Sequence, residues 1–120
     1  MKPWGLAALV LAGMSGAATS QELVAKGSGA VLRGLDKIDG DIVDMTLANG
    51  EAAKIGRLSV ELRECRYPQG TAADAYAFLT IRDVSNQDIM FDGWMIASSP
   101  ALNALEHPRY DVWVLSCKSE

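Results

Sequence analysis

The clearest signals of the fold lie in the last quarter of the chain, which reads Phe91-Asp92-Gly93-Trp94-Met95-Ile96-Ala97-Ser98-Ser99-Pro100-Ala101-Leu102-Asn103-Ala104-Leu105-Glu106-His107-Pro108-Arg109-Tyr110-Asp111-Val112-Trp113-Val114-Leu115-Ser116-Cys117. A serine hydroxyl followed by Pro100 is typical of a helix start, and Pro108 ends the segment. Apolar runs flank this segment on both sides. The stretch therefore predicts a strand, a short helix over residues 101–106, and a final strand over residues 110–117.

Upstream of this stretch, short apolar runs alternate with turn residues. Asp39-Gly40 and Asn49-Gly50 are both hairpin signals, because type I′ turns need residues that tolerate positive φ. The expected strands cover residues 30–38, 41–47, 51–55, 58–63, 75–83, 89–96 and 110–117. This spacing predicts one all-β domain, an antiparallel β-sandwich or partly open barrel with one short helix before the last strand.

Two expected strands are apolar almost throughout, which is typical of strands buried on both faces. Residues 75–83 are therefore expected to form a central strand. In the last strand Trp113 lies between two valines, so we expect Trp113 in the core. Residues 58–63 alternate cleanly, and a bulge or strand end near Glu64 is needed to turn Cys65 inward.

The first twenty residues have the composition of a cleaved secretory signal. A positive start at Lys2 precedes an uncharged apolar run, and Ala18 and Ser20 are the small residues that signal peptidase requires before Gln21. The run is shorter than the roughly 20 residues that span a bilayer, and no cysteine follows it to carry a lipid anchor. We therefore expect a periplasmic protein with a flexible N-terminus over residues 21–29 and a domain over residues 30–120.

Charge and composition narrow the classes of partner. The formal net charge is −4, and it becomes −5 when Lys2 is removed with the signal. No cluster of Lys and Arg is present, which argues against nucleic acid and anionic lipid as partners. No sequence feature indicates a cofactor.

The exported chain contains two cysteines, Cys65 and Cys117. An even number in an oxidising compartment predicts a disulfide. Closing a loop of roughly 50 residues would stabilise the fold by about 4 kcal/mol on the chain-entropy estimate. The alternatives are a redox pair, which usually shows the CxxC spacing, and a metal site, which needs further ligands.

Three segments resemble the DUF2155 family of small secreted proteins, found largely in alphaproteobacteria. They are the C-terminal stretch 91–117 quoted above, residues 30–38 (Ala-Val-Leu-Arg-Gly-Leu-Asp-Lys-Ile) and residues 58–68 (Leu-Ser-Val-Glu-Leu-Arg-Glu-Cys-Arg-Tyr-Pro). The resemblance covers nearly all of the chain after the signal. It implies a periplasmic location in a Gram-negative cell, and it implies no catalytic residues.

His107 is the single histidine of the chain and its one candidate for a general base near neutral pH. With Ser98 or Ser99 and Asp111 it suggests a hydrolase, but spacing alone does not establish a triad, and no Gly-x-Ser-x-Gly motif is present. The alternatives are that His107 ends the expected helix or makes a hydrogen bond in the core. A metal site is not expected, because one histidine among carboxylates lacks the spacing of a selective site.

Aromatic residues supply the remaining candidates. Trp94 and Tyr110, with His107, form the candidate binding surface, since aromatic side chains bring large contact areas to interfaces. We expect a non-enzymatic accessory module that docks onto another periplasmic or membrane protein, using this surface or an unpaired strand edge. The alternatives are a glycan- or peptidoglycan-binding module that uses Trp94 and Tyr110, and a hydrolase that uses His107.

Overall fold

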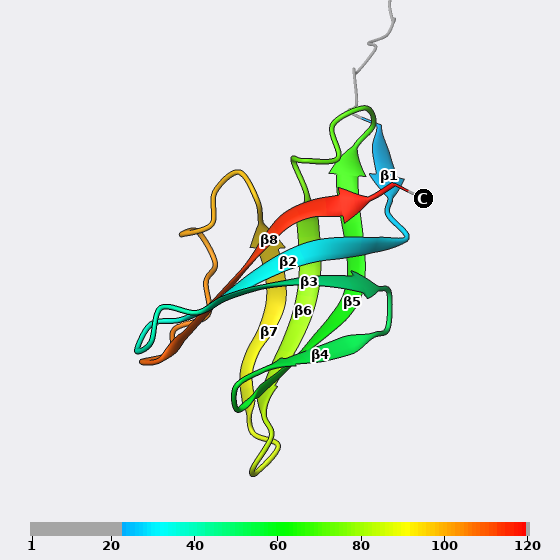
Figure 1. The fold of residues 1–120 in the computed structure, drawn as a ribbon. Helices are drawn as coiled ribbons and strands as arrows, with labels where there is room; N and C mark the ends of the chain where they lie inside the picture. Colours follow the sequence, from blue (N-terminus) through cyan, green and yellow to red (C-terminus); the bar gives the residue numbers. More distant parts are fainter. Residues whose placement is uncertain (1–22, 120) are drawn as a thin grey trace, which may run out of the picture.

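A computed structural model describes residues 23–119, which form eight strands in two antiparallel sheets (Figure 1). The strands are β1 (Val24–Lys26), β2 (Gly29–Asp36), β3 (Ile42–Ala48), β4 (Ala52–Ile55), β5 (Leu58–Pro68), β6 (Tyr76–Asp83), β7 (Ile89–Ile96) and β8 (Tyr110–Lys118). The predicted signal peptide and its cleavage site lie outside the described residues. Within residues 23–119 no helix is long and apolar enough to cross a membrane.

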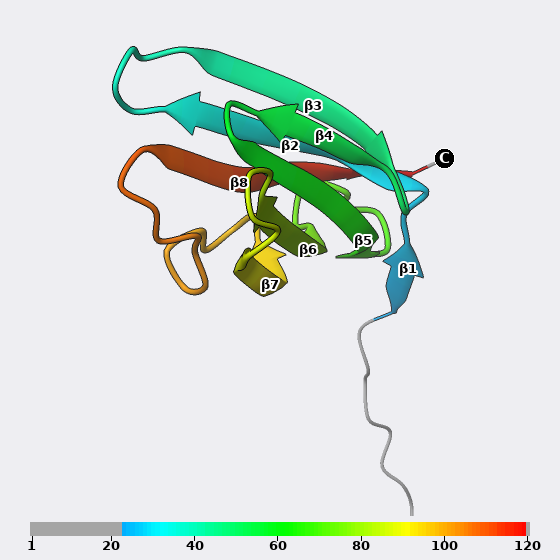
Figure 2. The same ribbon diagram turned by 90° about the horizontal axis from the view of Figure 1, so that it is seen from below.

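The two sheets face each other as a sandwich and do not close into a barrel (Figure 2). One sheet has the order β1-β5-β6-β7 with β4 paired to β5, and the other has the order β3-β2-β8. Alternate side chains from each strand enter the space between the sheets, as period-two alternation predicts. The fully buried residues include Leu32 of β2, Val60 and Leu62 of β5, and Leu79 and Ile81 of β6. The all-β prediction is confirmed.

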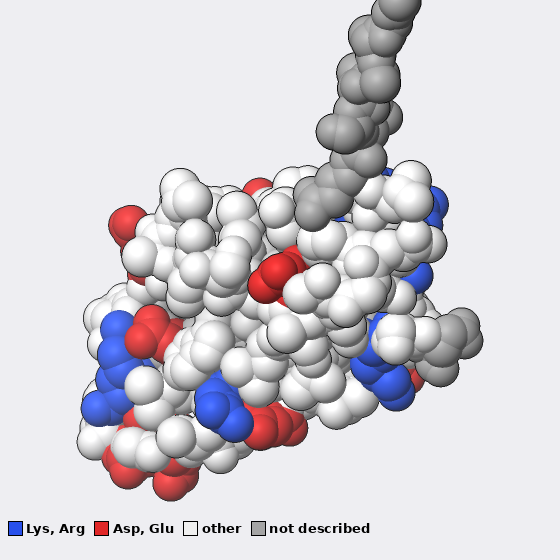
Figure 3. Space-filling model, turned by 90° about the horizontal axis from the view of Figure 1, so that it is seen from above, with Lys and Arg blue, Asp and Glu red and all other residues white. Residues whose placement is uncertain are grey.

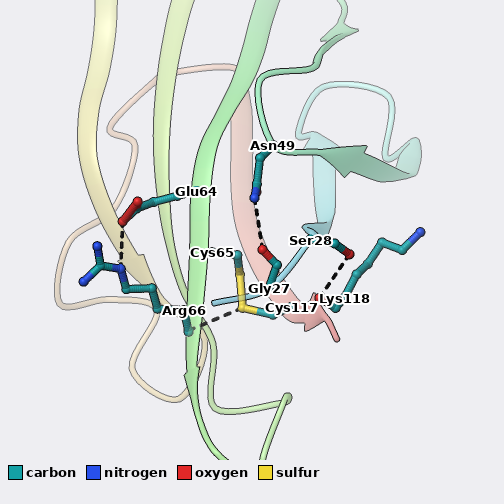
Figure 4. The surroundings of a disulfide bond; sticks show 8 residues. All are labelled: Gly27, Ser28, Asn49, Glu64, Cys65, Arg66, Cys117 and Lys118. Carbon is teal, nitrogen blue, oxygen red and sulfur yellow. Dashed lines mark hydrogen bonds and ion pairs between the residues drawn. A yellow bond between two sulfur atoms is a disulfide. The ribbon is translucent and has the colours of Figure 1, made fainter. Parts of the chain in front are cut away.

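A bulge in β5 turns Cys65 into the core, as the sequence predicts. The register between β5 and β6 shifts between Leu62 and Glu64, so that Arg63 is the extra residue. Cys65 then forms a disulfide with Cys117 of β8, with the two Cα atoms 5.7 Å apart. Figure 4 shows Cys65 pointing from β5 toward Cys117. The bridge therefore links the two sheets.

The predicted short helix is absent, and the prediction of a helix over residues 101–106 is wrong. One turn forms, in which the Leu102 N–H donates to the Ser99 carbonyl. The loop then turns inward, because Leu105 is buried in the core and Asn103 Nδ2 donates to the Trp94 carbonyl at 2.8 Å. A helix of one or two turns does not recover its nucleation cost, so these tertiary contacts set the path of the loop.

The prediction of a flexible N-terminus over residues 21–29 is also wrong for its described part. Val24–Lys26 form β1, which pairs with the end of β5. Gly27 and Gly29 are buried, and a Cβ atom on Gly27 would lie 2.8 Å from the Lys118 carbonyl oxygen. The two glycines allow the chain to cross closely from one sheet to the other.

The turn at Asn49-Gly50 forms, but it does not close a hairpin. Gly50 has a φ of 89°, yet β3 pairs with β2, whereas β4 pairs with β5 in the other sheet. The Gly50 N–H donates to the Leu62 carbonyl, and the Leu62 N–H donates to the Glu51 carbonyl. These bonds attach the turn to β5, so β3 and β4 diverge from it (Figure 1).

Candidate functional site

A groove of about 390 Å³ opens on the outer face of the five-stranded sheet, at the end where the disulfide lies. Four strands contribute its lining, which consists of Val24, Arg66, Tyr67, Pro68, Tyr76 and Trp94. The register explains the assembly: Arg66 lies opposite Tyr76, and Val24 lies opposite Pro68. Directly opposed residues share a face of the sheet. Figure 4 shows Arg66 on the side of β5 away from the Cys65 side chain.

Trp94 is half-buried in this groove, and its ring is held from two directions. Its indole meets Phe78 edge to face, with ring centroids 5.3 Å apart and an interplanar angle of 89°. The Arg66 guanidinium carbon lies 5.7 Å from the Trp94 ring centroid. Both are favourable aromatic geometries. Tyr76, which is 44% exposed, contributes a second aromatic surface. β6 is a central strand of its sheet, as predicted, but the prediction that residues 75–83 are covered on both faces is wrong.

Charged groups beside the groove form their own pairs. Arg66 Nε lies 2.8 Å from Glu64 Oε2. Thr80 is buried, and its hydroxyl accepts a hydrogen bond from Arg63 at 3.2 Å and donates one to Asp92 at 2.8 Å. These contacts stabilise the face of the sheet that carries the aromatic side chains of the groove.

Lys26 adds a positive charge at the rim of the groove. It lies directly opposite Arg66 in the pairing of β1 with β5. Like charges in directly opposed positions repel each other. Within residues 23–119, Lys26 makes no ion pair. Seen from this end of the molecule in Figure 3, most of the surface is uncharged, and basic and acidic groups lie side by side in several places.

Tyr110 does not belong to this surface. It is only 3% exposed, and its hydroxyl accepts a hydrogen bond from the Arg57 N–H at 3.3 Å. Its ring lies against Gly56, where a side chain would collide with it. Arg57 lies at the opposite end of β5 from Arg66. The structure therefore places Tyr110 in the core and does not bring it to Trp94.

His107 is half-buried near Tyr110, with ring centroids 5.3 Å apart. Its Nδ1 accepts hydrogen bonds from the backbone N–H groups of Arg109, at 3.0 Å, and Tyr110, at 3.2 Å. This nitrogen therefore holds the turn that leads into β8. Among the described residues no hydrogen bond joins the ring to Ser98, Ser99 or Asp111. The triad suggested by the sequence is not assembled in this geometry.

Trp113 also differs from its prediction. The inward-facing residues of β8 are Val112 and Val114, both buried, whereas Trp113 is half-buried on the outer face. It lies opposite Arg33 of β2. With Leu105 and neighbouring loop residues it lines a shallow depression of about 290 Å³. Side chains alternate between the two faces of β8 as predicted, but only one of these faces is fully buried.

The carboxylates near the β2–β3 hairpin are engaged by arginines. Asp36 accepts hydrogen bonds from Arg109, which lowers the pKa of the Asp36 carboxyl below its ordinary range. Asp44 accepts two hydrogen bonds from Arg33, and this contact likewise lowers the pKa of Asp44. Within residues 23–119 no group of three or more histidine, cysteine or acidic residues is arranged to hold a metal ion.

Several lining residues of the groove were not identified from the sequence. Tyr76 falls at period two on the same face of a strand as Phe78, which packs against Trp94, and this signal could have found it. If period-two alternation is continued past the bulge, Arg66 and Pro68 fall on the face opposite Cys65. This pattern could have identified both as lining residues. Val24 has no such signal, because its position depends on the pairing of β1 with β5.

Fold and groove together define a small disulfide-linked β-sandwich with an aromatic groove on one outer face. The chain belongs to the DUF2155 family: the family described as "Uncharacterized protein conserved in bacteria (DUF2155)" matches residues 30–117, which confirms the resemblance noted from the sequence. The chain is also similar to "Uncharacterized protein RP359" of Rickettsia prowazekii (strain Madrid E), with 29% identity over 87 residues that cover 69% of this chain and 56% of that protein. The chain thus spans little more than half the length of that relative. No solved structure matches it.

Proposed function

We propose that this protein is a non-enzymatic docking module of the periplasm that binds an extended segment of a partner protein in the groove at Trp94. The observation that carries the proposal is the groove itself. Its walls are aromatic and aliphatic, and its rings are held on hydrogen-bonded strands. Rigid, partly exposed aromatic residues in a concave site are typical of interface hot spots. The composition of residues 1–20 supports export.

The chemistry of the groove indicates the kind of segment that it binds. The lining suits an aromatic, proline or branched aliphatic side chain. Lys26 and Arg66 lie together at the rim, and one carboxylate, Glu64, is paired with Arg66. A partner segment with an acidic residue beside its apolar anchor would neutralise the remaining charge. We therefore propose an apolar residue flanked by Asp or Glu as the recognised element.

The test is photo-crosslinking in cells from a crosslinking amino acid placed at Tyr76. The control position is Leu102, which is 71% exposed and is not part of the groove lining. We expect one partner in near-stoichiometric amount from position 76 and none from position 102. Trp94→Ala should abolish the crosslink at an unchanged fold, checked by circular dichroism. Equal capture from both positions, or capture that survives Trp94→Ala, would contradict the proposal.

A glycan-binding module is the second candidate, favoured by the exposed surfaces of Trp94 and Tyr76. The Arg66 guanidinium covers part of the Trp94 ring, which leaves less area for a sugar to stack. Titration of tryptophan fluorescence with peptidoglycan fragments separates the two candidates, in a Trp113→Phe background that removes the second tryptophan of the domain. Saturable quenching that Tyr76→Ala abolishes, with Trp94 kept as the fluorescent reporter, would favour the glycan.

A further inference from the structure

β3 is an edge strand that lacks the usual protection of edges. It pairs with β2 on one side only. Natural edge strands are commonly short, bulged, or marked by Lys or Pro. β3 has seven residues, its register with β2 is unbroken, and its sequence Ile-Val-Asp-Met-Thr-Leu-Ala contains neither Lys nor Pro. It is therefore a long and regular strand that offers backbone groups for pairing.

The other edges in the described part of the chain are blunted. β1 and β4 have three and four residues. On β7, Asn103 donates to the Trp94 carbonyl and the Ser99 N–H donates to the Ile96 carbonyl. β8 has a register shift against β2, and it ends at Lys118. Compared with these edges, β3 is both regular in register and free of such contacts along most of its length.

The backbone groups that β3 offers can be identified from its hydrogen bonds. The Ala48 N–H turns away from β2, since it donates to Glu51 Oε1 at 2.8 Å. Alternate residues of an antiparallel strand direct their backbone groups to the same side. The N–H and C=O groups of Ile42, Asp44 and Thr46 therefore face the free edge. β4, which follows in the chain, diverges and pairs with β5 instead (Figures 1 and 2).

Exposed β-branched side chains lie at the same end of the strand. Ile42 is 61% exposed and Val43 is 42% exposed, and Ile38 in the adjoining turn is 72% exposed. Val43 lies opposite Gly34, on the side of β3 that faces the core further along the strand. Its side chain stays partly exposed there, because β4 has already diverged to pair with β5. A strand added to this edge would bury these side chains.

Among the described residues, the unpaired charge at the start of this edge is acidic. Asp44 is paired with Arg33 at 2.7 Å, and Asp39 lies 3.9 Å from Arg109. Asp41 makes no ion pair within residues 23–119. Two copies of the chain paired antiparallel through β3 would place the Asp39 and Asp41 end of one strand beside the Glu51 end of the other. Like charges would then meet, so a second copy is disfavoured.

We propose that β3 accepts an extended strand of another protein, in which β-branched residues alternate with Lys or Arg. Backbone hydrogen bonds to Ile42, Asp44 and Thr46 supply affinity, and the pattern of apolar and basic side chains supplies specificity. This surface is on the three-stranded sheet and is separate from the Trp94 groove. The two surfaces also differ in charge, since the groove has a basic rim.

Proline at position 46 tests the proposal directly. Thr46→Pro removes an N–H that faces the free edge and leaves the bonds to β2 in place, so the strand should still form. Thr46→Ala is the matched control, because it keeps the N–H. The probe is a synthetic eight-residue peptide of alternating Val and Lys. We expect its affinity to fall roughly tenfold in Thr46→Pro, as the loss of one or two backbone hydrogen bonds predicts, and to change less than about twofold in Thr46→Ala.

Amide hydrogen exchange measured by NMR locates the bound peptide. The amides of Val43, Met45 and Leu47 should exchange slowly in the free protein, and those of Ile42, Asp44 and Thr46 should become slow only with peptide. If Thr46→Pro does not fold, Asp41→Lys provides the second variant. It should bind the Val-Lys peptide more weakly, and it should bind a peptide with Glu in place of Lys more tightly.

Three outcomes would overturn the proposal. One is a folded Thr46→Pro protein that binds the peptide as tightly as the wild type does. Another is peptide-induced protection from amide exchange at residues outside β3. The third is a wild-type dimer in sedimentation that Thr46→Pro converts to a monomer without peptide, which would make a second copy the occupant. Trp94→Ala should leave peptide binding unchanged, so failure here is distinguishable from failure of the groove proposal.

Discussion

The Arg109 guanidinium donates hydrogen bonds to the Asp36 carboxylate, with Nη2 2.7 Å from Oδ2 and Nε 3.0 Å from both oxygens. Asp36 is the last residue of β2, and Arg109 directly precedes β8. The Asp36 carboxylate also accepts a hydrogen bond from the Ile38 N–H at 3.0 Å. This contact therefore fixes the base of the β2–β3 hairpin, which carries the free edge strand.

The Asp36 contact predicts a loss of stability in acid. Because the pKa of Asp36 is lowered in the folded state, the unfolded chain takes up the proton first as the pH falls. The stabilisation is complete above the ordinary aspartate pKa of about 3.9 and is lost as the pH drops through the lower folded value. Asp44 and Asp83, whose pKa values are also lowered by hydrogen bonds, act in the same direction.

Thermal melts of wild type and Asp36→Asn across pH 2 to 7 check this prediction. The difference in Tm should be largest near neutral pH and should shrink below about pH 4. Asp41→Asn, an exposed carboxylate of the same hairpin, is the control and should melt close to wild type at every pH. A difference for Asp36→Asn that is constant with pH would contradict the assigned role of the ion pair.

The disulfide predicts a large effect of reduction on stability. Cys65 and Cys117 are buried and join β5 to β8. The double variant Cys65→Ala and Cys117→Ala should lose up to about 4 kcal/mol in the free energy of unfolding, measured by urea denaturation. Dithiothreitol should lower the stability of wild type and leave the double variant unchanged. An oxidised wild type no more stable than its reduced form would refute this.

The burial of Tyr110 predicts a stability effect where the sequence suggested a binding role. Tyr110→Phe leaves the Arg57 N–H without its partner and should cost about 1 kcal/mol. Tyr110→Ala creates a cavity and should cost about 3–5 kcal/mol. Tyr76→Phe, on the exposed groove surface, is the control and should be near neutral. Full stability of Tyr110→Ala in urea would place this ring outside the core.

Prediction from sequence succeeded where a local pattern was enough. Period-two alternation located most strands, and the need to turn Cys65 inward predicted the bulge that the structure has at Arg63. Prediction failed where a pattern had two solutions. Along β8, alternation puts Tyr110 and Trp113 on opposite faces, but it does not say which face meets the other sheet. Tyr110 lies in the core and Trp113 lies half-buried on the outer face, which is the reverse of the prediction for both residues.

Short stretches of the chain were enough to predict strands β2 to β8, the cysteine pair and the hairpin at Asp39-Gly40, where Gly40 has a φ of 80°. These features depend on a few neighbouring residues or on the period-two alternation of side chains along a strand. They can therefore be predicted without knowledge of the fold. Two features depend on the tertiary structure: β3 and β4 separate into different sheets, and one groove brings together Val24, Arg66, Tyr76 and Trp94. The physical reason is that pairing between distant strands is selected by packing across the whole sandwich, which no short stretch of the chain contains.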